Sequence, residues 1–205
     1  MTDSVIDIGR QIGAIRREVT ADEELVRVQM DRRYPAAAAD VWNALTDPDR
    51  IRRWLLPISG DLRVGGSFQL EGNAGGEILA CEPPSLLCVT FGDASSVVEV
   101  RLIEDGPETV LTLEHTVPKA LAGGVAGALY VGPGWDGALL GLGLHLEGRQ
   151  SDNPTAAANS REGQAFSAAS VEAWVVVLEQ AGVDGETVAE ARQTSLAQFA
   201  PDLEG

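Results

Sequence analysis

The sequence predicts an α+β fold in which an antiparallel sheet packs against one long helix. Short apolar runs separated by glycine and proline turns fill residues 58–117, a pattern typical of an antiparallel meander. A helix is predicted over residues 134–148, where apolar residues recur with helical spacing, at Trp135, Leu139, Leu142 and Leu146. Apolar and charged residues alternate over 97–103, as expected for a sheet that is covered on one face only.

Residues 1–23 are predicted to add a strand to the sheet, near residues 11–19. A short helix is the alternative, because the apolar residues of this segment fit neither period cleanly. The next segment, residues 24–34, alternates between apolar and polar side chains and is predicted as a strand that Pro35 ends.

Two short helices are expected next, the first over residues 37–45. The second begins at Asp47-Pro48, a start signal with Asp as the N-cap and Pro at the first helical position. Its polar side carries a local basic cluster that we interpret as a solvated face: Arg50, Arg52 and Arg53.

The meander is expected to open with a hairpin around Gly65-Gly66. Its predicted strands are residues 61–64, 67–71, 77–81, 86–91, 97–103 and 109–117. Residues 119–134, rich in alanine and glycine, are expected to form either a plain crossover loop or a lid ahead of the long helix. The glycines inside that helix, Gly137, Gly141 and Gly143, each cost up to about 1 kcal/mol relative to alanine, so close approach of another element is expected there.

The polar residues 149–160 are predicted to be a linker, and residues 161–205 an α-helical extension of two helices. Two such helices cannot bury their apolar faces alone. We therefore expect the extension to dock on the main domain or on a partner subunit, the second option giving a homodimer through these helices.

Composition narrows the range of partners. The chain has 31 acidic and 15 basic side chains and a formal net charge of −16, which disfavours nucleic acid and anionic membranes as partners. No apolar run reaches the ~18 residues that a membrane span needs. The first residues show no signal-peptide pattern, so a cytoplasmic location is expected. The two cysteines, Cys81 and Cys88, are expected to be free thiols.

Motifs for cofactor, metal and triad chemistry are absent from the sequence. It contains no GxSxG, no HExxH, no P-loop and no GxGxxG at a strand-to-helix turn. We therefore expect no cofactor and no metal site, and the sequence assigns no catalytic residue. Glu77 and His115 are candidates for general acid–base catalysis, if they face each other across a cavity.

The chain resembles the START-like (SRPBCC, pollen-allergen-like) superfamily, in the branch of the heat-shock-protein-90 ATPase activator homologues. The resemblance covers about residues 24–148. It is carried by Pro35 and by five segments: VWNALTDPDRIRRW at 41–54, GDLRVGGSF at 60–68, GGEILACEPPSLLCVTF at 75–91, TVLTLEHT at 109–116 and GPGWDGALLGLGLHL at 132–146. The pattern over 162–199 also resembles an extension found in some bacterial members. The resemblance implies a helix-grip fold, in which a curved sheet wraps around the long helix and leaves a cavity for an apolar small molecule.

The expected lining of this cavity combines inward strand positions with residues from the helices: Trp54, Phe68, Leu70, Leu79, Phe91, Val98, Val100, Leu111, Leu113, His115, Trp135 and Leu139. Three functions are compatible with it. The first, which we favour over an enzyme, is binding of an apolar or amphipathic small molecule without catalysis. The second is a cyclase-like or isomerase-like enzyme that uses a pocket acid and His115. The third is an interaction module resembling a chaperone co-factor.

Overall fold

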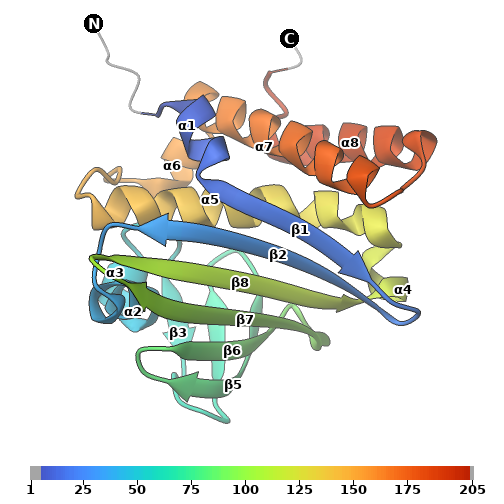
Figure 1. Ribbon diagram of the computed structural model, residues 1–205. Helices are drawn as coiled ribbons and strands as arrows, with labels where there is room; N and C mark the ends of the chain where they lie inside the picture. The colour runs from blue at the N-terminus through green and yellow to red at the C-terminus, as the bar shows by residue number, and fades with distance from the viewer. Residues whose placement is uncertain (1–5, 204–205) are drawn as a thin grey trace, which may run out of the picture.

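A single antiparallel sheet curves against one long helix, and two further helices cover the other side of that helix (Figure 1). The computed structural model describes residues 6–203. The sheet has eight strands in the order β1-β2-β8-β7-β6-β5-β4-β3. The strands are β1 (Ile15–Ala21), β2 (Leu25–Tyr34), β3 (Ile58–Gly60), β4 (Ser67–Leu70), β5 (Gly75–Glu82), β6 (Leu86–Phe91), β7 (Asp93–Asp105) and β8 (Glu108–Pro118). The helix-grip architecture predicted from the sequence is confirmed.

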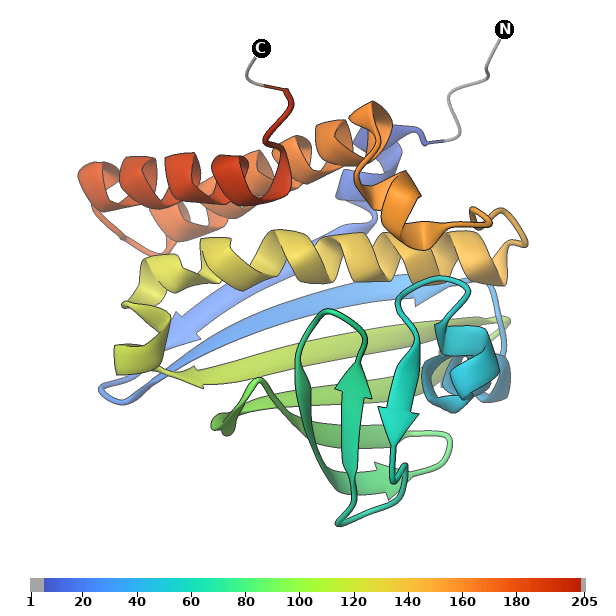
Figure 2. The same ribbon diagram turned by 180° about the vertical axis from the view of Figure 1, so that it is seen from behind.

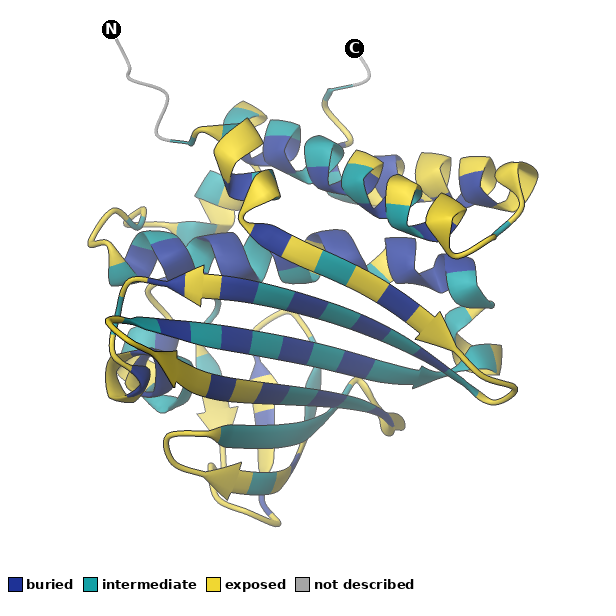
Figure 3. Cartoon of the chain, in the orientation of Figure 1, coloured by how far each residue is buried: buried dark blue, intermediate teal, exposed yellow. Residues whose placement is uncertain are grey.

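The inner face of the sheet is built from rows of side chains that run across the strands. One row aligns Val28, His115, Val98, Val89 and Ile78 from five consecutive strands. His115 is the polar member of this row, and it is buried, as are Val28, Val98 and Ile78, whereas Val89 is half-buried. Burial alternates along β2 and β8, so one face of these strands packs on the helix and the other meets solvent (Figure 3).

The N-terminal segment contains both of the elements that the sequence left open. Helix α1 (Ile8–Gly13) comes first, and β1 follows and pairs antiparallel with β2 at the edge of the sheet. Residues 1–5 and 204–205, which belong to the expected N-terminal segment and to the extension, lie outside the described residues.

The two short helices after β2 are α2 (Ala38–Thr46) and α3 (Pro48–Ile51). The predicted N-cap is confirmed, because the Asp47 side chain accepts hydrogen bonds from the backbone N–H groups of Asp49 (2.8 Å) and Arg50 (3.2 Å). Arg50 is not simply solvated: its Nε donates to Nε2 of His145 at 3.1 Å, and its Nη1 pairs with Asp40.

The strand predicted at residues 61–64 is wrong. The strand that pairs with β4 is β3, which comes earlier in the chain. Gly60 has φ 127°, a conformation that side-chain-bearing residues rarely adopt, and it turns the chain out of the sheet. Residues 61–66 then form a loop that is anchored by the Gly65 N–H donating to the Ile78 carbonyl at 2.8 Å.

The long helix α5 (Ala128–Leu146) begins earlier than predicted. Short helices α4 (Lys119–Ala122) and η1 (Val125–Gly127) precede it, so most of the expected loop is helical. Pro133 lies inside α5 and has no N–H to give the carbonyl of Leu129. The hydroxyl of Ser195 donates to that carbonyl instead, at 2.7 Å.

The C-terminal extension packs on α5 of its own chain (Figure 2). A short helix α6 (Pro154–Ala158) interrupts the expected linker, and α7 (Arg161–Gln180) and α8 (Gly185–Phe199) follow. Asp136 of α5 is fully buried and accepts hydrogen bonds from Ser170 (2.5 Å) and Trp174 (3.1 Å) of α7. It also pairs with Arg17 of β1 at 2.8 Å. Burial raises the pKa of the Asp136 carboxyl, and these three partners oppose that shift.

Candidate ligand-binding site

A cavity of two chambers lies between the inner face of the sheet and α5. The outer chamber has a volume of about 500 Å³ and the inner chamber about 200 Å³. They meet at a shared wall formed by Leu55, Leu70, Phe91, Trp135 and Ala138. The rings of Phe91 and Trp135 are in contact there, with centroids 5.0 Å apart.

The inner chamber is almost entirely apolar. It lies under α2, α3 and the middle of α5, over the part of the sheet where β4 to β8 curve. Most of the lining residues predicted from the sequence are found here: Trp54, Phe68, Leu70, Phe91, Val98, Val100, Leu111, Leu113, Trp135 and Leu139. Thr46, Arg63 and Cys81 are its main polar contributors.

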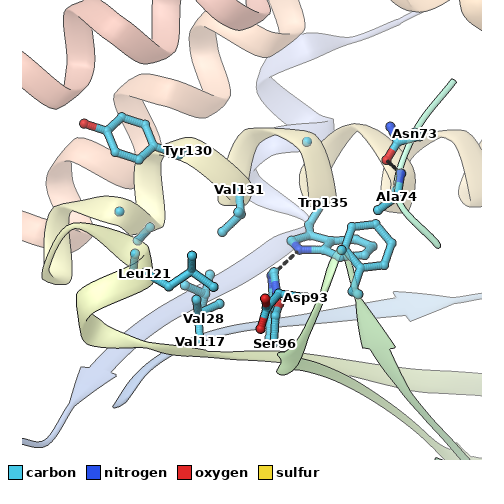
Figure 4. Close-up of a pocket in the computed structure, with 18 of the residues that line it drawn as sticks. Val28, Asn73, Ala74, Asp93, Ser96, Val117, Leu121, Tyr130, Val131 and Trp135 are labelled. Carbon is cyan, nitrogen blue, oxygen red and sulfur yellow. Dashed lines mark hydrogen bonds between the residues drawn. The ribbon is translucent and has the colours of Figure 1, made fainter. Parts of the chain in front are cut away.

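The outer chamber has a more mixed lining and lies toward the start of α5 (Figure 4). Leu121 of α4 and Tyr130 of α5 line it and are exposed, at 57% and 38% of their surfaces. Asn73, Asp93 and Ser96 supply polar groups on the sheet side. Phe199, at the end of α8, also lines this chamber, so the C-terminal extension contributes to its wall.

A hydrogen-bonded chain of three side chains connects the helix to the sheet at this point. The indole Nε1 of Trp135 donates to Nδ1 of His115 at 3.0 Å. On the other side of the ring, Nε2 of His115 lies 2.8 Å from the hydroxyl of Ser96. Indole N–H is a donor only, so Nδ1 must be the bare nitrogen. His115 therefore carries its proton on Nε2 and donates it to Ser96.

His115 is uncharged at neutral pH. Burial lowers its pKa from 6.5 to about 4, because the imidazolium would lose its hydration in this apolar row. No carboxylate among residues 6–203 forms a hydrogen bond or ion pair with its ring to offset that cost. The imidazole therefore acts here as a neutral link between Trp135 and Ser96.

Two of the residues singled out from the sequence lie away from the cavity. Leu79 is 41% exposed, and Glu77 is exposed beside the start of β5. The cause is a β-bulge between Ile78 and Ala80, which inserts one extra residue and changes the parity of the strand. Ile78 and Cys81 line the inner chamber instead, and Glu77 does not meet His115.

Several residues that line the cavity were not predicted from the sequence, among them Ser96 and Phe199. Ser96 lies two residues before Val98 on the same face of β7, so extending that alternation would have found it. Phe199 has no comparable local signal, because its place in the wall depends on how α8 docks.

The described part of the chain shows no metal-binding cluster, no disulfide and no membrane-spanning helix. Residues 6–203 contain no group of three or more His, Cys, Asp or Glu side chains placed to hold a metal ion. Cys81 and Cys88 are both free thiols, as predicted. None of the described helices combines the length and apolarity that crossing a bilayer requires.

Known proteins with similar sequences or structures support this description. CalU16 from Micromonospora echinospora has a crystal structure with a TM-score of 0.66 and 37% identity, over 80% of this chain and 98% of that chain. DynU16, from the dynemicin biosynthetic locus, is 25% identical with a TM-score of 0.52, over 64% of this chain and 51% of that chain. The Aha1 dimer from Colwellia psychrerythraea shares the fold at 17% identity, with a TM-score of 0.51 over 61% of this chain and 98% of that chain.

No curated protein sequence matches the chain. The family model described as "Activator of Hsp90 ATPase homolog 1-like protein" matches residues 35–147. That range is more than half of the chain, and it contains both short helices, β3 to β8 and all of α5. The chain therefore belongs to the activator of Hsp90 ATPase homolog 1-like family, within the START-like superfamily.

Proposed function

We propose that this protein binds a small apolar or amphipathic molecule in the two-chamber cavity. The observation that carries the proposal is the lining of the two chambers, which is mainly apolar and carries a few polar groups: Asn73, Asp93 and Ser96 in the outer chamber, and Thr46, Arg63 and Cys81 in the inner one. Ligand sites usually combine a mainly apolar lining with a few placed polar groups, in volumes of roughly 300–1,000 Å³. The outer chamber, at about 500 Å³, falls in that range.

The geometry favours binding over acid–base catalysis. Glu77 lies outside the cavity, and the proton on Nε2 of His115 prevents that nitrogen from accepting the proton of Ser96. A serine nucleophile needs the opposite tautomer, with the base nitrogen free to accept. DynU16 belongs to a biosynthetic locus, which supports a small organic molecule as the ligand.

Native mass spectrometry of the protein purified from cells, compared with the same sample denatured, tests the proposal. We expect the native protein to carry one bound molecule in stoichiometric amount, seen as extra mass that is lost on denaturation. Titration with N-phenyl-1-naphthylamine, an uncharged fluorescent probe of apolar sites, provides a second measurement. We expect its fluorescence to rise on binding to the wild-type protein.

Two variants localise the probe. Ala138→Trp places a large side chain at the junction of the chambers and should weaken probe binding at least tenfold. Ala189→Trp makes the same change at an exposed position of α8 and should leave binding unchanged. A protein that carries no ligand from cells and gives the same probe titration with either variant would show that the cavity is not a binding site.

A further inference from the structure

We propose that Ser96 donates a hydrogen bond to the bound molecule, and that the ligand is an uncharged apolar compound with a carbonyl oxygen at its outer-chamber end. This inference rests on the proposed binding function and adds the chemical class of the ligand. It starts from the direction of the hydrogen bonds in the chain from Trp135 to Ser96.

Trp135 of α5 sets the donor-to-acceptor direction of the two hydrogen bonds that join it to His115 and Ser96. Trp135 donates to Nδ1 of His115, so Nε2 carries the imidazole proton and donates to the Ser96 oxygen. The hydroxyl group of Ser96 accepts this bond and keeps its own proton. Rotation about the C–O bond can aim that proton away from His115.

The Ser96 proton has no acceptor within the described part of the chain. His115 is the hydrogen-bond partner of the Ser96 side chain among residues 6–203. Ser96 is only 4% exposed, yet it lines the outer chamber. A donor that is buried and unpaired is costly, and an acceptor atom on a ligand in the chamber would satisfy it.

The charges around the outer chamber select an uncharged acceptor. No Lys or Arg side chain is among its lining residues, whereas Asp93 is. Hydrogen bonds from the Ser95 hydroxyl and N–H lower the pKa of Asp93, so this carboxylate is ionised at neutral pH. In the outer chamber, a ligand carboxylate would therefore meet the like charge of Asp93 and no lining cation, in a protein with a formal net charge of −16.

The remainder of the ligand is expected to be apolar. From Ser96 the outer chamber extends to Phe91 and Trp135, which form part of the wall that it shares with the inner chamber. The inner chamber is lined mainly by aliphatic and aromatic side chains, apart from Thr46, Arg63 and Cys81. A compound with its carbonyl at Ser96 and its hydrocarbon part toward the two rings would match the polarity of this lining. Figure 4 shows Ser96 and Asp93 close together on the strand side of Trp135.

A matched pair of probes tests the inference on the full-length protein. 2-Acetylnaphthalene and 2-ethylnaphthalene have nearly the same shape, and only the first carries a carbonyl. Their dissociation constants are measured by displacement of N-phenyl-1-naphthylamine from the wild type and from Ser96→Ala. We expect Ser96→Ala to weaken binding of the acetyl compound by about fivefold or more, and to change binding of the ethyl compound less than about twofold, as for the loss of one neutral hydrogen bond.

Ser96→Thr keeps the hydroxyl and should restore most of the affinity for the acetyl compound. A measurement that needs no variant is the infrared absorption of the ¹³C-labelled carbonyl, which should move to lower wavenumber on binding relative to its position in hexane. If both probes bind but Ser96→Ala weakens them equally and the carbonyl band stays at its hexane position, the inference fails while the binding function stands. If neither probe displaces the dye, and the dye itself does not bind, both fail.

Discussion

His115 shows how one side chain can link two elements without carrying charge. It lies in a row of aliphatic residues and links α5 to the sheet through Trp135 and Ser96. The second histidine, His145, accepts from Arg50 at Nε2, so its proton is on Nδ1. The chain contains only these two histidines, and the structure gives them opposite tautomers.

The low pKa of His115 makes stability depend on pH in a defined window. Below pH 6.5 the unfolded chain binds a proton at this residue, whereas the folded protein does not until pH approaches 4. The contribution of the neutral His115 imidazole to the free energy of unfolding is therefore fully present above pH 6.5 and is lost as pH falls toward 4. We expect His115→Gln, which can accept from Trp135 and donate to Ser96, to remove this dependence. Urea unfolding between pH 4 and 7.5 should show the wild type losing about 3 kcal/mol more than the variant.

The comparison with His115→Gln isolates this residue, because His145 and the carboxyl groups titrate in both proteins. Nitrogen-15 spectra of histidine-labelled protein provide a control, since they report each tautomer directly. Parallel stability curves for the two proteins, or an Nδ1 proton on His115, would contradict the assignment.

The limits of sequence reasoning at this scale are visible in β5 and β7. Regular alternation placed Val98, Val100, Leu111 and Leu113 on the inner face, and the structure has them there. The same rule fails at Leu79, because a bulge is a local insertion in the pairing and leaves no clear mark on a single strand's sequence.

The glycines of α5 fall into two classes that the sequence alone does not separate. An added Cβ at Gly132 would lie 2.4 Å from the Trp174 ring, and one at Gly141 would lie 2.7 Å from the Trp54 carbonyl oxygen. A Cβ added at Gly143 would lie 2.8 Å from the Arg32 guanidinium. A Cβ added at Gly137 would have no neighbour within 4 Å. Close approach therefore explains Gly132, Gly141 and Gly143, and the expectation is wrong for Gly137.

A pair of glycine-to-alanine changes tests this division within one helix. Gly132→Ala forces the buried indole of Trp174 to move and should destabilise the protein by about 1–3 kcal/mol. Gly137→Ala meets no obstacle and should stabilise it by about 0.5–1 kcal/mol, through helix propensity. Thermal or urea unfolding measures both. Changes of the same sign and size at the two positions would argue against close packing as the reason for Gly132.

The start of α5 could not be predicted because tertiary contacts supply what its local sequence lacks. Glycines and a proline in residues 127–134 disfavour a helix on propensity alone. In the structure, Ser195 satisfies the carbonyl that Pro133 leaves free, and Trp174 covers Gly132. Both contacts come from α7 and α8, so no window of sequence around α5 contains them.

At the scale of the whole molecule, α5 lies between the sheet side of the cavity and the C-terminal extension, which reaches the outer chamber at Phe199. Its neighbouring residues Trp135 and Asp136 face opposite sides, the first toward His115 and the second toward Arg17, Ser170 and Trp174. The extension thus fixes the rotation of the helix that carries Trp135, and Phe199 adds a wall to the outer chamber. Its fully buried apolar side chains Phe166, Val171, Trp174 and Leu178 all belong to α7, which packs on α5, α8, α1 and β1 of the same chain.

Removing residues 150–205 should therefore destabilise the remaining domain rather than release an independent appendage. Truncation exposes the outer face of α5 and leaves Asp136 with Arg17 as its one remaining described partner. Replacing a single buried Trp or Phe by Ala lowers the free energy of unfolding by about 3–5 kcal/mol. The whole free energy of unfolding of a domain is only about 5–15 kcal/mol. We expect the truncated protein to self-associate or to unfold at a much lower temperature, measured by light scattering and calorimetry. A truncated protein that stays monomeric, with an unchanged Tm and unchanged affinity for N-phenyl-1-naphthylamine, would show that neither the stability of α5 nor the cavity depends on the extension.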